Sequence, residues 1–260
     1  MKNPGYDATK VFEDIGNFQD RIVAFVDVMG IRNRMFKSQN PQDLRLYSQL
    51  MYMYAHQPFA VDKLSTIMFS DCMYIIAEKE YIDDLICLLA NFSYNLLVNR
   101  ISIIEGQAEG GIKGKIMWDC FKLRGGVTYG KVLVLDDEAK KKNIEFNSNI
   151  ILGPAAIRAY ELENKEAIYP RIIIDDCFLE LLKQENKIPE EYYFICEKTG
   201  DNYYLDFWAY MFKGKVGQKD FLEGCIEYVK KELEGAFQQK NAKLVGQLVW
   251  HIEYLKKHLL

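Results

Sequence analysis

The segment RIVAFVDVMGIRNRMF, residues 21–36, ends an apolar run in a single acid, Asp27, and has a glycine three residues later. An apolar run such as Ile22 to Val26 is typical of a buried strand. An acid at the end of a buried strand is costly unless something pairs with it. The segment LSTIMFSDCMYIIAE, residues 64–78, repeats the pattern with Asp71 between two apolar runs. We therefore expect the two acids to serve one site.

Asp27 and Asp71 are 44 positions apart, and the predicted helix between them is long enough to return the chain beside the first strand. Two facing carboxylates repel, and Mg²⁺ or Mn²⁺ removes that conflict because these ions favour carboxylate oxygens. The Val28 carbonyl is a further candidate ligand. The amides of Gly30 and Ile31 are candidates to bind phosphate at the start of the next helix. The ordinary alternative is that each acid caps a helix or a turn.

The composition excludes several classes of function. The chain has 260 residues, of which 49% are hydrophobic, and a net charge of −4, so no basic excess indicates nucleic acid or a membrane surface. Its six cysteines form no C-x-x-C pair, and three histidines are too few and too scattered for a zinc site. The N-terminus is polar and acidic, unlike a signal peptide, and the apolar runs are too short for a membrane span. We expect a soluble cytoplasmic protein.

Strands interspersed with helices predict an α+β fold, a mixed sheet with helices packed on it. We expect an N-terminal arm at 1–20, one domain at 21–215 and a C-terminal helical extension at 216–260. The expected elements are a strand at 21–28, a helix at 41–57, a hairpin turning at Ser70-Asp71, a helix at 81–104, a loop at 105–115, strand–turn–strand at 121–137, a helix entered at Pro154, a strand and short helix at 169–182, a hairpin around 198–201, and two helices from 219 broken near Gly235.

Six segments, in order, resemble motifs of the class III nucleotidyl cyclases. FVDVMGI (25–31) resembles their first metal motif and IMFSDCMYII (67–76) their second. The later segments resemble, in turn, a strand pair, the glycine that opens a helix, a strand with its helix, and the closing hairpin: LRGGVTYGKV, GPAAIRAYELE, YPRIIIDDCFLELL and EKTGDNYYLDF. The resemblance runs from about residue 21 to about 208. It implies that residues 21–215 form a class III cyclase homology domain, with a ferredoxin-like βαββαβ core.

The sequence departs from the purine cyclases where they recognise the base. Ile67 replaces their base-reading lysine, and Ile150 replaces their base-reading acid or cysteine. Ile157 and Glu161 stand where they have an asparagine and an arginine. The helix pattern and the Ser-Asp metal motif are similar to the pyrimidine cyclases of bacterial anti-phage defence, the Pycsar systems. That resemblance implies conversion of UTP or CTP to a cyclic monophosphate, with uridylate cyclase preferred, and a product that activates a separate effector.

The resemblance also implies the remaining parts of the site. It implies two divalent ions, Mn²⁺ or Mg²⁺: one held by Asp27 and Asp71, the other holding the triphosphate. Lys198 matches the lysine that reaches the triphosphate. Arg158 and Arg171 are the candidates to replace the missing catalytic arginine, although for either one taken singly an ordinary surface salt bridge is the favoured explanation.

In this family the metal acids of one chain meet a helix of a second chain, so a homodimer is implied. Four tyrosines are candidates to stack on a small base: Tyr47, Tyr52, Tyr54 and Tyr160. Two other functions stay open. One is a catalytically inactive cyclase-like domain that binds a nucleotide or a partner. The other is a nucleotidyltransferase of palm-like topology, against which the absence of a G-G-D-[DE]-F motif weighs.

Overall fold

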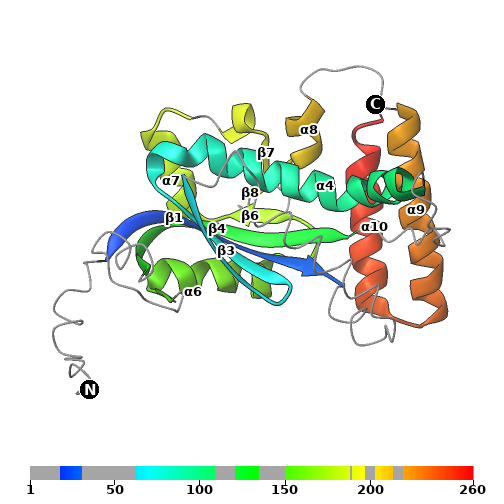
Figure 1. The fold of residues 1–260 in the computed structure, drawn as a ribbon, viewed down its shortest axis with the longest axis horizontal. Coiled ribbons are helices and arrows are strands. Elements are labelled where there is room, and N and C mark those ends of the chain that lie inside the picture. The colour runs from blue at the N-terminus through cyan, green and yellow to red at the C-terminus, as the bar shows by residue number, and fades with distance from the viewer. Residues whose placement is uncertain are drawn as a thin grey trace, which may run out of the picture.

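A mixed β-sheet with helices on both faces forms the body of the protein (Figure 1). The computed structural model describes residues 18–30, 63–108, 121–134, 150–187, 189–196, 203–212 and 219–259. Within these ranges the sheet has eight strands in the order β2-β3-β1-β4-β6-β8-β7, and β5 pairs with β4 beside that path. The α+β fold class expected from the sequence is confirmed.

The strands are β1 Gln19–Met29, β2 Leu64–Phe69, β3 Cys72–Ala77, β4 Lys122–Val134, β5 Ile151–Leu152, β6 Ile172–Ile174, β7 Phe194–Cys196 and β8 Tyr203–Leu205. The α-helices are α4 Ile82–Ala108, α6 Pro154–Glu161, α7 Asp176–Gln184, α8 Phe207–Phe212, α9 Lys219–Gln238 and α10 Ala242–Lys256. Shorter helical turns are η1 Lys79–Tyr81, η2 Leu162–Glu166 and η3 Pro189–Tyr192.

The central strand β1 is buried on both faces. Ile22 and Ala24 belong to the larger apolar core, which includes α4, whereas Val23 and Phe25 pack with residues of α6. In Figure 1, α4 and α6 cover opposite faces of the sheet. Burial on both faces explains why this strand is apolar without alternation. The predicted strand at 21–28 is therefore confirmed, with two more residues at its start.

The predicted strand–turn–strand at 121–137 is wrong, because β4 is one continuous strand of 13 residues. Gly125 and Gly126 lie inside this strand, where they allow close packing of neighbouring segments. A Cβ at Gly125 would lie 2.7 Å from the Phe25 carbonyl oxygen, and one at Gly126 would lie 2.2 Å from Leu162 Cβ. Glycine is needed here because neighbouring backbone lies where a side chain would be.

The hairpin prediction is confirmed, with Ser70 at φ 57° in the turn between β2 and β3. The long helix is also confirmed, but α4 continues to Ala108, into the segment expected to be a loop. β7 and β8 pair antiparallel as expected. The helix expected at 41–57 and the hairpin tip at 198–201 lie outside the described residues.

The C-terminal helices do not break near Gly235, which lies inside α9. The chain turns at Gln239 to Asn241, where Lys240 has φ 52°. The Asn241 side chain then accepts a hydrogen bond from the Leu244 amide, 3.1 Å away, and caps α10. Gly235 is therefore accommodated inside α9, whereas the positive φ of Lys240 marks the turn between α9 and α10.

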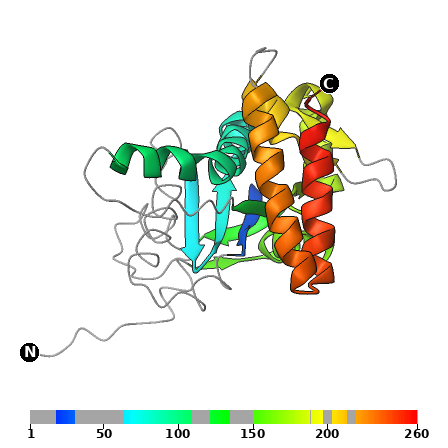
Figure 2. The same cartoon turned by 90° about the vertical axis from the view of Figure 1, so that its right-hand side faces the viewer.

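The helices α9 and α10 stand side by side along one side of the sheet (Figure 2). The buried Tyr254 hydroxyl of α10 donates to Asp206, 2.7 Å away, and accepts from the Trp208 amide. The Trp250 ring stacks on Tyr169, with centroids 5.7 Å apart. The C-terminal extension is thus packed into the domain through shared aromatic side chains. No helix in the described part of the chain is both long and apolar enough to cross a membrane.

His251, on the inner face of α10, is 2% exposed, and among the described residues neither ring nitrogen has a hydrogen-bond partner. Burial, assisted by the nearby Lys122 ammonium, lowers the pKa of His251 to about 3. The unfolded chain binds a proton on this histidine near pH 6.5, whereas the folded chain does not. Stability is therefore lost as the pH falls below that value.

Replacing His251 by Phe should remove this part of the acid sensitivity. From pH 7.5 to pH 5.5, the wild-type free energy of unfolding should fall by about 1.4 kcal/mol more than that of His251→Phe, because one proton is taken up on unfolding. Urea unfolding at the two pH values measures the difference. Equal losses in both proteins would show that His251 is not held neutral in the fold.

A methyl group at Gly126 should cost about 1–3 kcal/mol of stability, because it overlaps the backbone and side chains at the α6–η2 junction. The control is Gly224→Ala in α9, where nothing lies within 4 Å of the added carbon. That variant should gain up to about 1 kcal/mol from helix propensity. Urea unfolding measures the free energy of unfolding of both variants. A Gly126→Ala variant as stable as the wild type would show that the α6–η2 junction shifts to accept the added carbon at little cost.

Candidate metal centre

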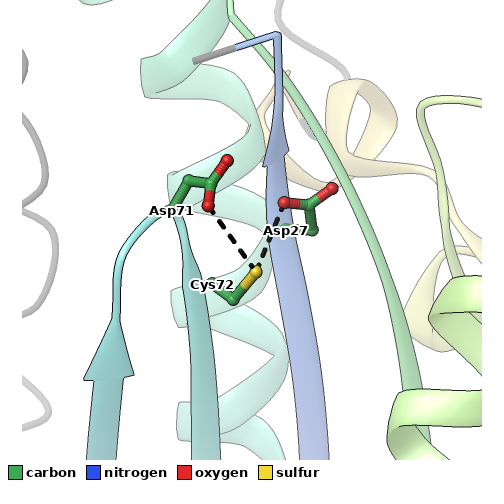
Figure 3. A group of neighbouring side chains, drawn as sticks. All are labelled: Asp27, Asp71 and Cys72. Carbon is green, nitrogen blue, oxygen red and sulfur yellow. Dashed lines mark hydrogen bonds between the residues drawn. The ribbon is translucent and has the colours of Figure 1, made fainter. Parts of the chain in front are cut away.

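The pairing of β1 with β3 brings the two acids together. In this antiparallel ladder Asp27 lies opposite Cys72, and the Val28 amide donates to the Asp71 carbonyl oxygen at 3.0 Å. Asp71 occupies the second position of the hairpin turn, immediately before β3. The side chains of Asp27, Asp71 and Cys72 consequently point into one space at the end of β1 (Figure 3).

Asp27, Asp71 and Cys72 each offer one ligand atom, and these atoms all lie within 4.8 Å of one another. The Cys72 sulfur is 3.4 Å from Asp27 Oδ1 and 3.9 Å from Asp71 Oδ1, so one oxygen of each acid faces the same point. Burial first, and then the two carboxylates, raise the pKa of the Cys72 thiol, which stays protonated as a donor. Two half-buried carboxylates in this arrangement fit a hard divalent cation.

Arg124 of β4 is a third component, which the sequence analysis missed. It lies opposite Asp27 in the β1–β4 ladder, and its Nε donates to Asp27 Oδ2 at 2.9 Å. Its terminal Nη2 is 2.9 Å from the same oxygen and 2.7 Å from Glu163 Oε1. The signal in the sequence was an arginine inside a strand, beside two glycines. Its partner could not be found without the strand register.

Glu163 of η2 is also absent from the sequence-based site. It is 3% exposed. Burial raises the pKa of Glu163 to about 7, outweighing the opposite effect of the Arg124 guanidinium. Near neutral pH this carboxyl group therefore lies between its protonated and ionised forms, and the Arg124 guanidinium favours the ionised form. No sequence pattern distinguishes this acid from Glu161 or Glu166 on the same segment.

Arg158, one of the two candidate catalytic arginines, holds two acids of its own. Its Nη1 is 2.8 Å from Glu166 Oε1, and its Nε donates to Asp175 Oδ2 at 3.3 Å. Asp175 also accepts from the Thr128 hydroxyl and caps α7 at the Phe178 amide. These contacts tie α6 to α7. A role of Arg158 toward phosphate remains a prediction.

Arg171, the other candidate, is 7% exposed. Its guanidinium carbon lies 5.4 Å from the Tyr169 ring centroid and 5.9 Å from those of Tyr204 and Trp250. Its carbonyl oxygen accepts from the Gly125 amide at 3.0 Å. The side chain therefore contributes cation–π contacts beneath α10. The Arg171 side chain would have to move away from these rings to contact a substrate. Its catalytic role also remains a prediction.

The remaining predicted site residues lie near the end of β1 or outside the described residues. Val28 is buried, and its amide is used in the β1–β3 pairing. Gly30 follows β1 with φ +89°, a conformation that favours glycine. Ile31 and Lys198 lie outside the described residues, so phosphate binding by Gly30, Ile31 and Lys198 is still a prediction.

An exposed apolar surface lies on the α6 side of the sheet. It consists of Phe69, Ile157 and Tyr160, which are 48%, 62% and 46% exposed. The buried Phe25 ring contacts both the strand part and the helix part of this surface. Its centroid lies 5.9 Å from that of Phe69 in β2 and 5.4 Å from that of Tyr160 in α6. We call these three residues the α6 apolar surface. Phe25 and Phe69 are each two residues before a site acid, so this surface starts close to the metal centre.

No protein-family model and no curated protein matches this sequence. Similar solved structures include a bacterial light-regulated adenylyl cyclase, at 14% identity over 74% of this chain and 92% of that chain, with a TM-score of 0.48. The catalytic core of a rhodopsin–guanylyl cyclase is 11% identical over 73% of this chain and 96% of its own, with a TM-score of 0.47. The adenylyl cyclase CyaB from P. aeruginosa is 14% identical over 73% and 95%, with a TM-score of 0.45.

Proposed function

We propose that this protein is a metal-dependent nucleotide cyclase that converts UTP, or CTP, to the 3′,5′-cyclic monophosphate and pyrophosphate, as a signal in anti-phage defence. One observation carries the proposal. Asp27 and Asp71 come from distant segments, and their side chains offer ligand oxygens within 4.8 Å of each other and of Cys72. The six motifs in class III order supply the reaction class.

Each described residue has a definite task in this proposal. Asp27 and Asp71 present one oxygen each to Mn²⁺ or Mg²⁺. Bound divalent ions would acidify the ribose 3′-hydroxyl and neutralise the charge of the triphosphate. Gly30 is exposed at the end of β1, and its amide is the candidate to bind phosphate oxygens. Lys198 stays the candidate for the terminal phosphates, and Arg158 and Arg171 stay the candidates to replace the missing catalytic arginine.

The preference for a pyrimidine rests on the residues that replace the purine-reading groups. Ile67 is 8% exposed and apolar, so it offers no hydrogen bond to a base edge. The partly exposed rings of Phe69 and Tyr160 both contact the Phe25 ring, and Phe25 and Phe69 each lie two residues before a site acid. Stacking on such a surface tolerates a small base.

The inactive cyclase-like domain stays the second candidate because of two described residues. Ile157, at the position of the family's asparagine, is 62% exposed and apolar. Glu161, at the position of its arginine, pairs with Lys165 at 2.6 Å. Neither side chain could stabilise a phosphate in the same way. Turnover by the purified protein distinguishes the two candidates.

Incubation with Mn²⁺ and each of ATP, GTP, CTP and UTP should give a cyclic monophosphate from UTP or CTP, resolved by chromatography and mass spectrometry. Asp27→Asn and Asp71→Asn should each lower turnover at least about 100-fold, because each removes a charged cation ligand. The matched control is Asp20→Asn on the same strand, where an exposed acid pairs with Lys131.

Full turnover by either site variant would exclude the proposed metal centre. Purine products would exclude the pyrimidine preference alone. No product with either metal, from protein shown to be dimeric, would favour the inactive domain.

We also propose that the protein acts as a homodimer and that the α6 apolar surface lies in its interface. Three partly exposed apolar side chains next to a site are typical of a surface that is covered in the functional state. A two-fold arrangement would give two equal sites, each completed by the partner chain.

Ile157→Lys should weaken the dimer at least about tenfold, because a buried lysine in the interface has no partner, and it should leave the stability of the monomer unchanged. Sedimentation equilibrium measures the dissociation constant. The control is Val249→Lys on α10, which changes an apolar side chain that is 42% exposed away from this surface. A dimer unaffected by Ile157→Lys would place the interface elsewhere.

A further inference from the structure

Arg124 contacts only one oxygen of Asp27. Its Nε and Nη2 both lie 2.9 Å from Asp27 Oδ2. The other oxygen, Oδ1, faces the Cys72 sulfur at 3.4 Å, on the side of Asp71 (Figure 3). Arg124 therefore fixes the orientation of the Asp27 carboxylate and leaves its second oxygen available to a cation.

Glu163 is brought to Arg124 by two local features. The segment Leu162–Glu166 continues α6 as a wider π-helical turn, a form often found at functional sites. Gly126 allows this turn to approach β4, since a Cβ there would lie 2.2 Å from Leu162 Cβ and 3.1 Å from the Glu163 amide nitrogen. Arg124 and Gly126 are two positions apart, so they share one face of the strand. The same close approach thus brings Glu163 within reach of Arg124.

The charges of this cluster explain why a second acid is useful. Arg124 alone would cancel the charge of Asp27 and weaken its attraction for a divalent cation. Glu163, 2.7 Å from Arg124 Nη2, offsets the guanidinium charge. A planar guanidinium reaches both carboxylates at once, which a lysine ammonium does less well. Asp27 then keeps a net negative charge together with a fixed orientation.

We propose that Glu163 is a positioning residue for the metal centre and that it acts through Arg124, holding this arginine on one oxygen of Asp27 so that the other oxygen binds the cation. The inference rests on the metal centre of the proposed function. It assigns no contact between Glu163 and the cation or the substrate. Outer partners of metal ligands typically change metal affinity by about 10–100-fold.

The test is direct Mn²⁺ binding without nucleotide, followed by the electron paramagnetic resonance signal of free Mn²⁺. Glu163→Gln keeps the shape of the side chain but removes the charge, and should weaken Mn²⁺ binding about tenfold or more. Glu180→Gln is the matched control, because it removes the same charge from an exposed acid of α7 that pairs with Lys183.

A double-mutant cycle tests whether Glu163 acts through Arg124. In an Arg124→Gln background, Glu163→Gln should change Mn²⁺ affinity less than about twofold, because the connecting side chain is absent. The double variant leaves no buried unpaired charge at this pair. If Arg124→Gln does not fold, Arg124→Lys serves as the second background, in which the effect of Glu163→Gln should be clearly smaller than in the wild type.

The outcomes separate this inference from the proposed function. Wild-type Mn²⁺ affinity in Glu163→Gln, or the same loss in both backgrounds, overturns the inference. If Asp27→Asn abolishes Mn²⁺ binding in that same experiment, the metal centre itself stands. If the wild-type protein binds no Mn²⁺, the metal centre and the inference fall together.

Discussion

Strand β1 is hydrogen-bonded along both edges and buried on both faces, and its register determines every contact of the site. Pairing with β3 places Asp27 opposite Cys72, and pairing with β4 places it opposite Arg124. A shift of one residue in either ladder would turn Asp27 to the α4 face of the sheet. The apolar side chains of β1 resist that shift because both faces are packed. The energy that holds the core therefore also holds the acid in place.

The sequence was sufficient to predict the pair of acids but not the rest of the site. Asp27 and Asp71 could be found because each interrupts an apolar run, where a charged side chain needs an explanation. Arg124 and Glu163 could not be paired, since their contact depends on strand register and on the approach of η2 to β4. The turn expected within 121–137 is absent, because β4 is continuous and its Gly125 and Gly126 serve close packing. A helix break was expected near Gly235, which instead lies inside α9.

The buried polar groups of the protein are grouped where elements of different sequence regions meet. Asp206, Tyr254 and the Trp208 amide join the C-terminal extension to the sheet. Lys122 at the start of β4 pairs with Glu232 of α9. Arg158 joins α6 to α7 through Glu166 and Asp175. Such contacts specify how elements dock, because a mispaired buried charge is costly. The extension is thus part of the folded unit that carries the site.

The position of Trp250 has a consequence for observing this unit. Its indole ring is stacked between Tyr169 and Tyr254 and lies 5.9 Å from the Arg171 guanidinium. The Arg171 carbonyl oxygen, in turn, accepts from the amide of Gly125, the residue next to Arg124. Any separation of α10 from the sheet would move this indole from an aromatic stack into water and shift its fluorescence emission to the red. The boundary of the C-terminal extension thus contains a natural spectroscopic label, one strand away from the metal centre.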